Sequence, residues 1–92
     1  MNIKVNGINI FHFDVYRLED SFEFYEIGGD EYFEKGICLI EWGELISDAL
    51  PSQYMEIQFH KDEKDNNIRY IDLIAHGSNY EMLLDKLKKE LF

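Results

Sequence analysis

Residues 36–42, Gly-Ile-Cys-Leu-Ile-Glu-Trp, carry the strongest indication of the fold class. Four apolar residues, 37–40, run without interruption and are followed by Glu41 and by Trp42, the only tryptophan. A continuous apolar run bounded by turn residues is typical of a strand buried on both faces inside a parallel sheet. A charge at the tip of such a strand is costly unless it has a partner, so the pattern raises the question of what Glu41 holds.

The segment before this strand predicts a β-hairpin. Asn6-Gly7 separates two apolar runs, 3–5 and 8–15, and both residues tolerate the positive φ angles of a type I′ turn. The second run alternates, which gives it two distinct faces. One face carries Phe11, Phe13 and Val15, and the other carries His12, Asp14 and Tyr16.

Short helical segments are expected on both sides of the 37–42 strand. Acids in the first turn of residues 18–27 favour a helix, which Gly28-Gly29 ends. Asp30 is in place to cap a further turn over 30–35. Residues 43–50 predict another short helix, with Leu45, Ile46 and Leu50 facing the core and Pro51 ending it.

The C-terminal part predicts a second hairpin and a helix. Residues 54–61 and 68–75 both alternate apolar and polar side chains around a charged turn, which indicates an antiparallel pair. Ser78 and Glu81 have the spacing of a capping box at the start of the final helix. We therefore predict an α/β chain with an N-terminal hairpin, a buried parallel strand, an antiparallel C-terminal hairpin and a C-terminal helix.

Composition limits the classes of function. A chain of 92 residues predicts one domain, residues 1–92, and the net charge of −10 argues against direct binding to nucleic acid or to an anionic membrane. The same charge permits a metal ion or a basic protein partner. No signal peptide or transmembrane segment is evident, so the cytosol is the expected compartment (cytoplasmic). The single cysteine, Cys38, reads as a buried small hydrophobe rather than as a reactive thiol.

Two carboxylates are candidates for chemistry. A strand that is apolar up to a terminal acid has the form of a Walker B element, in which the acid holds Mg²⁺ or the attacking water. Asp14 also lies late in a strand, and it shares a hard cation with Glu41 if the two strands are neighbours. The alternative for Glu41 is a strand that ends on a charged residue with no role in binding. The alternative for Asp14 is an exposed residue paired with Arg17.

Three further features have both a structural and a functional interpretation. Trp42 is either a packing residue or a stacking surface for a base. His12 lies two residues before Asp14 on the same strand face, and it is the histidine that could serve a site there. Residues 19–44 contain nine acids and one base, which is either a solvated surface or a docking surface for a basic partner.

Two segments taken together resemble a known family. HFDVYRL (12–18) and FYEIGGDEYFEKGICLIEW (24–42) are similar to the bacterial tRNA threonylcarbamoyladenosine biosynthesis ATPase family, TsaE (YjeE). The order and spacing match over residues 11–42. Leu50-Pro51, the charged hairpin, Gly77 and the final helix match the C-terminal part of the family, so the resemblance covers nearly the whole chain.

The resemblance implies a P-loop nucleotide-binding fold that binds and hydrolyses ATP with Mg²⁺. It also implies partnership with the proteins TsaB and TsaD in forming N6-threonylcarbamoyladenosine at position 37 of tRNA. Matched by motif, Asp14 corresponds to the family acid near the magnesium, Glu41 to the acid of the Glu-Trp signature, and Trp42 to its tryptophan beside the nucleotide. Asp14 and Glu41 are thus the expected metal-binding and catalytic residues, and Trp42 the expected cofactor-binding residue.

The chain departs from the family at the P-loop. The motif G-x-x-x-x-G-K-[ST] is absent, and no Gly-Lys dipeptide occurs. In P-loop proteins the backbone N–H groups and the lysine of this motif bind the phosphates. We therefore expect a truncated P-loop NTPase-like sheet that has no ATPase activity alone. The chain then corresponds to the C-terminal part of a TsaE-like domain, as a shortened gene product, a fragment or a degenerate copy. The alternatives are a non-catalytic interaction module and a fragment that forms a homodimer through the exposed sheet edge and apolar face.

Overall fold

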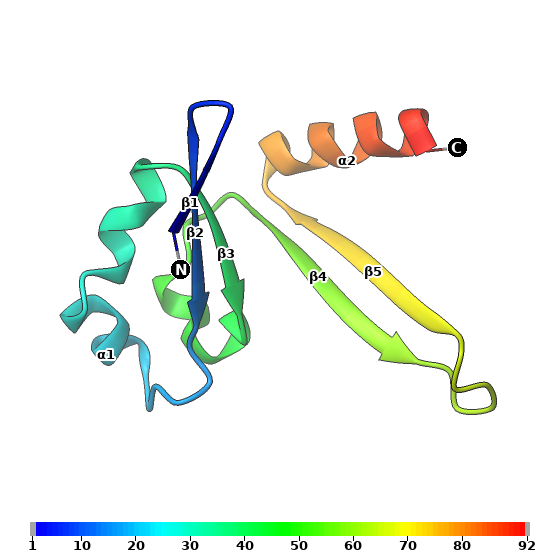
Figure 1. Cartoon of the computed structure of the whole chain (residues 1–92), viewed down its shortest axis with the longest axis horizontal. Helices are drawn as coiled ribbons and strands as arrows, with labels where there is room; N and C mark the ends of the chain where they lie inside the picture. The colour runs from blue at the N-terminus through cyan, green and yellow to red at the C-terminus, as the bar shows by residue number, and fades with distance from the viewer. Residues whose placement is uncertain (1, 92) are drawn as a thin grey trace. The chain divides into compact units, whose positions relative to one another are not determined.

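A computed structural model describes residues 2–91, and its contacts divide the chain into two compact units, Met1–Pro51 and Ser52–Phe92 (Figure 1). We call these the N-terminal unit and the C-terminal unit and describe each by itself. The expectation of a single domain, based on chain length, stays a prediction. The mixture of helices and strands is that of the predicted α/β class.

The N-terminal unit is built on a three-stranded sheet with the order β1-β2-β3. β1 (Asn2–Val5) pairs antiparallel with β2 (Ile8–Asp14), and β2 pairs parallel with β3 (Ile37–Glu41). Asn6 and Gly7 have φ angles of 50° and 82°, which is the turn that their sequence predicts. Both the N-terminal hairpin and the parallel strand are therefore confirmed.

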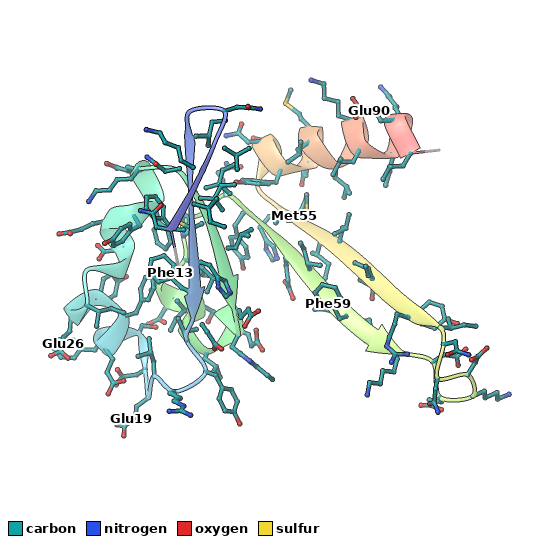
Figure 2. The ribbon with its side chains drawn as sticks, viewed as in Figure 1. Phe13, Glu19, Glu26, Met55, Phe59 and Glu90 are labelled. Carbon is teal, nitrogen blue, oxygen red and sulfur yellow. The ribbon has the colours of Figure 1, made fainter. Side chains whose placement is uncertain are left out.

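One face of this sheet is covered by short helices. α1 (Ser21–Glu26) and the two 3₁₀ helices η1 (Gly29–Glu34) and η2 (Gly43–Ala49) supply its partners, and Figure 1 shows α1 beside the sheet. The fully or nearly buried core consists of Val15, Phe24, Ile46 and Ala49. Figure 2 shows Phe13 of β2 among the side chains between the sheet and the helical segments, and its ring lies 5.8 Å from that of Phe24.

The helical segments are shorter than predicted. The expected helix 18–27 begins only at Ser21, because Leu18 N–H donates to Val15 O in a turn and the side chain of Asp20 caps Glu23 N–H. The following turn is capped by the left-handed Gly28 rather than by Asp30. In residues 43–50 the backbone kinks at Ile46, which buries Ile46 and leaves Leu45 exposed, contrary to the prediction that both face the core.

The other face of the sheet has no cover from its own unit. Ile37 and Leu39 of β3 are 50% and 53% exposed, so β3 differs from the strand buried on both faces that its apolar run predicted. Alternate residues of a strand point to opposite faces, and only Cys38 and Ile40 point toward the helices. The uncovered face also carries the half-exposed Ile3, Val5 and Ile8.

The C-terminal unit is a hairpin followed by a helix. β4 (Tyr54–Lys61) and β5 (Arg69–His76) pair antiparallel over their whole length, and α2 (Ser78–Leu91) follows, as predicted. α2 contacts β5, and Tyr80, Leu84 and Leu87 are the half-buried residues of the helix. No described residue of 52–91 is fully buried.

The junction between β5 and α2 is held by a side chain from the start of the unit. Gln53 Oε1 accepts the N–H of Asn79 at 3.1 Å, and the Gln53 side chain lies directly over Gly77, whose φ is +91°. The N–H of Glu81 donates to Gly77 O. The capping box predicted between Ser78 and Glu81 is thus replaced by backbone bonding and by Gln53.

Candidate functional site at the carboxyl edge of β2 and β3

The predicted acids meet at one edge of the sheet. In the parallel pair, Asp14 of β2 lies directly opposite Glu41 of β3. The two side chains belong to the same face, because residues in register on neighbouring strands point to the same side. The sequence predicted that Asp14 and Glu41 share a cation if their strands are neighbours. The strands are neighbours, so this condition is met.

Asp14 is fixed by the loop that follows it. Its Oδ1 accepts the N–H of Tyr16 at 3.0 Å, an Asx-type turn that directs the chain away from the strand. The next residue, Val15, donates its N–H to Glu41 O at 3.2 Å and extends the pairing of the two strands by one bond. Two hydrogen bonds thus hold the backbone where β2 ends.

Glu41 is approached by a histidine. His12 Nε2 lies 3.5 Å from Glu41 Oε1, and the two side chains are 35% and 60% exposed. His12 occupies the row of β2 beside Leu39, one row before the acids. The sequence associated His12 with Asp14 on its own strand, whereas the structure places it within reach of the acid on the neighbouring strand.

Trp42 stands at the same edge in a strained conformation. Its φ of 64° is in the left-handed region, which is uncommon for a large residue. The half-exposed indole lies against Tyr16, with 4.9 Å between the ring centroids. Tyr16 was not among the predicted site residues, although its place two residues after Asp14 was the available signal.

The arrangement fits Mg²⁺ better than a metal that needs many protein ligands. Within residues 2–91, no three His, Cys, Asp or Glu side chains are grouped to hold a metal ion. Mg²⁺ is usually bound by one or two carboxylates together with water and substrate phosphates. Asp14 and Glu41 supply two carboxylates on one face, so the residues present suit a magnesium ion that a phosphate ligand helps to hold.

Cys38 lies on the covered side of β3, away from this edge. Burial raises the pKa of the Cys38 thiol, and its sulfur lies 3.4 Å from Tyr32 O, to which it donates. Both effects disfavour the thiolate, which is the reactive form. The interpretation of Cys38 as a packing residue is supported.

The acids of residues 19–44 are mostly on the surface of the N-terminal unit. Figure 2 shows Glu19 and Glu26 at its outer side. Some of these acids have local structural roles: Asp20 caps α1, and Glu23 Oε2 accepts the N–H of Glu19 at 3.0 Å. Ser21 Oγ donates to Asp48, which joins α1 to η2.

The fold and this edge define an α/β protein with paired carboxylates where two parallel strands end. The family model of the threonylcarbamoyl adenosine biosynthesis protein TsaE matches residues 2–70, and the chain belongs to the TsaE family. It is 41% identical over 81 residues to the tRNA threonylcarbamoyladenosine biosynthesis protein TsaE of Bacillus subtilis, covering 87% of this chain and 49% of that protein. The TsaE of Rickettsia conorii is 33% identical over 88 residues, covering 92% and 49%.

A solved structure extends the similarity to the fold. The crystal structure of Bacillus subtilis YdiB matches with a TM-score of 0.80 and 32% identity, covering 100% of this chain and 56% of that one. The chain thus spans about half the length of the curated relatives that it matches. Among residues 2–91, no helix has the length and apolar character needed to cross a membrane.

Proposed function

We propose that this chain acts in the biosynthesis of tRNA N6-threonylcarbamoyladenosine as part of an adenine nucleotide site. Asp14 and Glu41 would hold the Mg²⁺ of the nucleotide, and Trp42 would lie beside it. The observation that carries the proposal is the register of β2 and β3, which sets Asp14 directly beside Glu41 at the carboxyl edge of parallel strands. Ligands of open α/β sheets bind at such edges.

The residues around the acids have separate roles in this proposal. Magnesium, when bound, neutralises phosphate charge. The Asx turn at Asp14 holds one carboxylate in place, and His12 orients the other through Glu41 Oε1. Tyr16 supports the exposed indole of Trp42 next to the nucleotide. Each of these groups positions a ligand rather than forming a bond with it.

We further propose that residues 1–92 by themselves do not hydrolyse ATP. They contain no G-x-x-x-x-G-K-[ST] motif, so the phosphates would be held through magnesium without a cradle of backbone N–H groups. The relatives are named for threonylcarbamoyladenosine biosynthesis, which supports a role in that pathway. We propose TsaB and TsaD as the partner proteins and the cytoplasm as the compartment.

A fluorescence titration tests the nucleotide site. Trp42 is the only tryptophan and follows Glu41 directly, so its emission has a single source. We expect a saturable change with Mg-ADP or Mg-ATP that is lost in Glu41→Ala and kept in the matched variant Glu44→Ala. An unchanged emission up to millimolar nucleotide would contradict the proposal.

A second candidate function is a non-catalytic interaction module. It is favoured by the half-exposed apolar side chains on the uncovered face of the sheet and by the exposed acids of residues 19–44, which suit a protein partner. Capture of TsaD or TsaB by a chain that shows no nucleotide response would support this alternative over the first.

A further inference from the structure

Two loops leave the sheet beside the paired carboxylates, one after β2 and one after β3. Both start at the same end of the strand pair, because β2 and β3 run in the same direction (Figure 1). The first loop carries Tyr16 two residues after Asp14, and the second carries Trp42 directly after Glu41. The centroids of the two rings lie 4.9 Å apart, with 50° between their planes. The aromatic pair therefore joins the two segments that carry the acids.

Tyr16 lies in a turn whose backbone is held by hydrogen bonds. Leu18 N–H donates to Val15 O at 3.0 Å, which places Tyr16 in the middle of the turn. Val15 is buried in the core, and its N–H donates to Glu41 O at 3.2 Å. The N–H of Tyr16 itself donates to Asp14 Oδ1 at 3.0 Å. The ring of Tyr16 thus projects from a well-anchored segment.

Trp42 has a backbone conformation that needs support. Its φ of 64° and ψ of 32° lie in the left-handed region, where the Cβ of an ordinary residue crowds the carbonyl oxygen. Such residues persist where surrounding contacts hold them, and they gather at functional sites. On the backbone, Leu45 N–H donates to Trp42 O at 3.0 Å. On the side chain, the aromatic ring that lies against the indole within residues 2–91 is that of Tyr16.

Burial of apolar area is a poor explanation for this aromatic pair. Tyr16 remains 61% exposed and Trp42 50% exposed, whereas the ring of Phe24 in the core is completely buried. The hydrophobic contribution to stability scales with the area removed from water, so the exposed pair contributes much less than a core ring. A role at the neighbouring carboxylates explains the contact better than a role in packing.

We propose that Tyr16 is a positioning residue for both carboxylates of the proposed magnesium site. Its N–H holds Asp14 directly. Its ring holds Trp42 in the left-handed turn, and the direction of that turn determines where the preceding residue, Glu41, lies. Groups that orient metal ligands without touching the metal alter metal affinity. This inference rests on the proposed function and adds to it a residue that sets the affinity of the site for magnesium.

Substitution separates the two links that Tyr16 makes. Tyr16→Ala removes the ring and keeps the backbone N–H, so the bond to Asp14 remains and the link to Glu41 through Trp42 is lost. Tyr16→Phe keeps the ring and should behave as wild type. Tyr70→Ala is the matched control, because Tyr70 is a tyrosine of the C-terminal unit that is also exposed, at 52%.

The first measurement needs no ligand. The decay of fluorescence anisotropy of Trp42 reports how freely the indole moves within the chain, and Trp42 is the only tryptophan. We expect a larger fast component in Tyr16→Ala than in wild type, with Tyr16→Phe and Tyr70→Ala unchanged. An equal fast component in Tyr16→Ala and wild type would show that the ring does not hold the indole, and it would overturn the inference.

The second measurement isolates the carboxylates. Calorimetry gives the affinity for ADP with Mg²⁺ and with EDTA, and the ratio of the two affinities reports the contribution of magnesium. A contact of Trp42 with the base contributes to both affinities and leaves the ratio unchanged. We expect this ratio to fall roughly tenfold in Tyr16→Ala and to stay at the wild-type value in Tyr16→Phe and Tyr70→Ala. Circular dichroism of each variant checks that it is folded.

The outcomes distinguish this inference from the proposed function. A wild-type chain that binds no ADP in Mg²⁺ contradicts the proposed function, and the inference fails with it. A wild-type chain with magnesium-dependent binding and a Tyr16→Ala variant with the same ratio contradict the inference alone. Equal losses in Tyr16→Phe and Tyr16→Ala would also overturn it, because the ring contact would then not be the link that matters.

Discussion

The two units of the chain are stabilised in different ways. The N-terminal unit has a core of its own, in which Phe24 and Ile46 are completely buried and Val15 nearly so. The C-terminal unit has no fully buried residue among 52–91, and it depends on strand pairing, on α2 and on side-chain contacts along the hairpin. An isolated two-stranded hairpin is only marginally stable in water, so the C-terminal unit needs contacts beyond strand pairing. The edge that carries Asp14 and Glu41 therefore belongs to the better-packed unit.

The core of the N-terminal unit gives the largest expected effect. Phe24→Ala should lower the free energy of unfolding of this unit by about 3–5 kcal/mol, because the ring is fully buried and contacts the rings of Phe13 and Phe33. A unit of this size has a total stability of roughly 3–8 kcal/mol. Urea unfolding followed by the emission of Trp42 measures the loss.

The matched substitution in the other unit is Phe59→Ala. Phe59 is 74% exposed, so the Trp42-reported transition should shift by less than about 0.5 kcal/mol. Equal effects of the two substitutions would show that the units unfold together and that the difference in their packing has no energetic meaning.

The junction of the C-terminal unit gives an intermediate effect. Gly77→Ala should cost about 1–2 kcal/mol, because a side chain is disfavoured at φ +91° and its Cβ would displace Gln53. Displacement of Gln53 also breaks its bond to Asn79 N. Thermal unfolding followed by circular dichroism at the helix band measures the effect on α2.

Gly43→Ala is the control for this junction. A Cβ at Gly43 meets only ordinary contacts, so the helix band should melt at the wild-type temperature. A Gly77→Ala chain that melts like wild type would show that the Gln53 cap does not hold α2 in place.

Local pattern predicted most of the elements and the two site acids. Asn6-Gly7 determined the first turn, alternation gave both strands of the second hairpin, and a terminal acid on an apolar run indicated where β3 ends. These features depend on neighbouring residues in the sequence. The sequence left open whether the strands that carry Asp14 and Glu41 are neighbours, and the structure shows that they are, with the two acids in register.

The features that sequence missed depend on partners far away in the chain. The apolar run of β3 cannot show which of its faces is covered, because the cover comes from other segments. The Trp42–Tyr16 contact and the His12–Glu41 approach join segments that are distant in sequence. One miss is local instead: the helix predicted over 18–27 begins only at Ser21, because Leu18 N–H donates to Val15 O in a turn.

The smallest expected effect is a pH dependence of the C-terminal unit. The Gln58 side chain donates to Glu56 at 2.6 Å and His76 lies 2.9 Å away on the other oxygen, and both lower the pKa of Glu56. A lowered pKa in the folded state adds stability that is present above the ordinary glutamate value, about 4.3, and is lost as the pH falls through the folded value. The melting temperature of α2 should therefore fall more steeply below about pH 5 in wild type than in Glu56→Gln.

A glutamate in the hairpin turn serves as the control for this titration. Glu63→Gln removes the same charge from the turn that joins β4 to β5, so the steep fall in the melting temperature should persist. The contrast isolates Glu56 from the general protonation of an acidic chain. If Glu56→Gln and Glu63→Gln melt alike across this pH range, the Gln58–Glu56–His76 contacts do not stabilise the hairpin. Its stability would then come from strand pairing and from α2 alone.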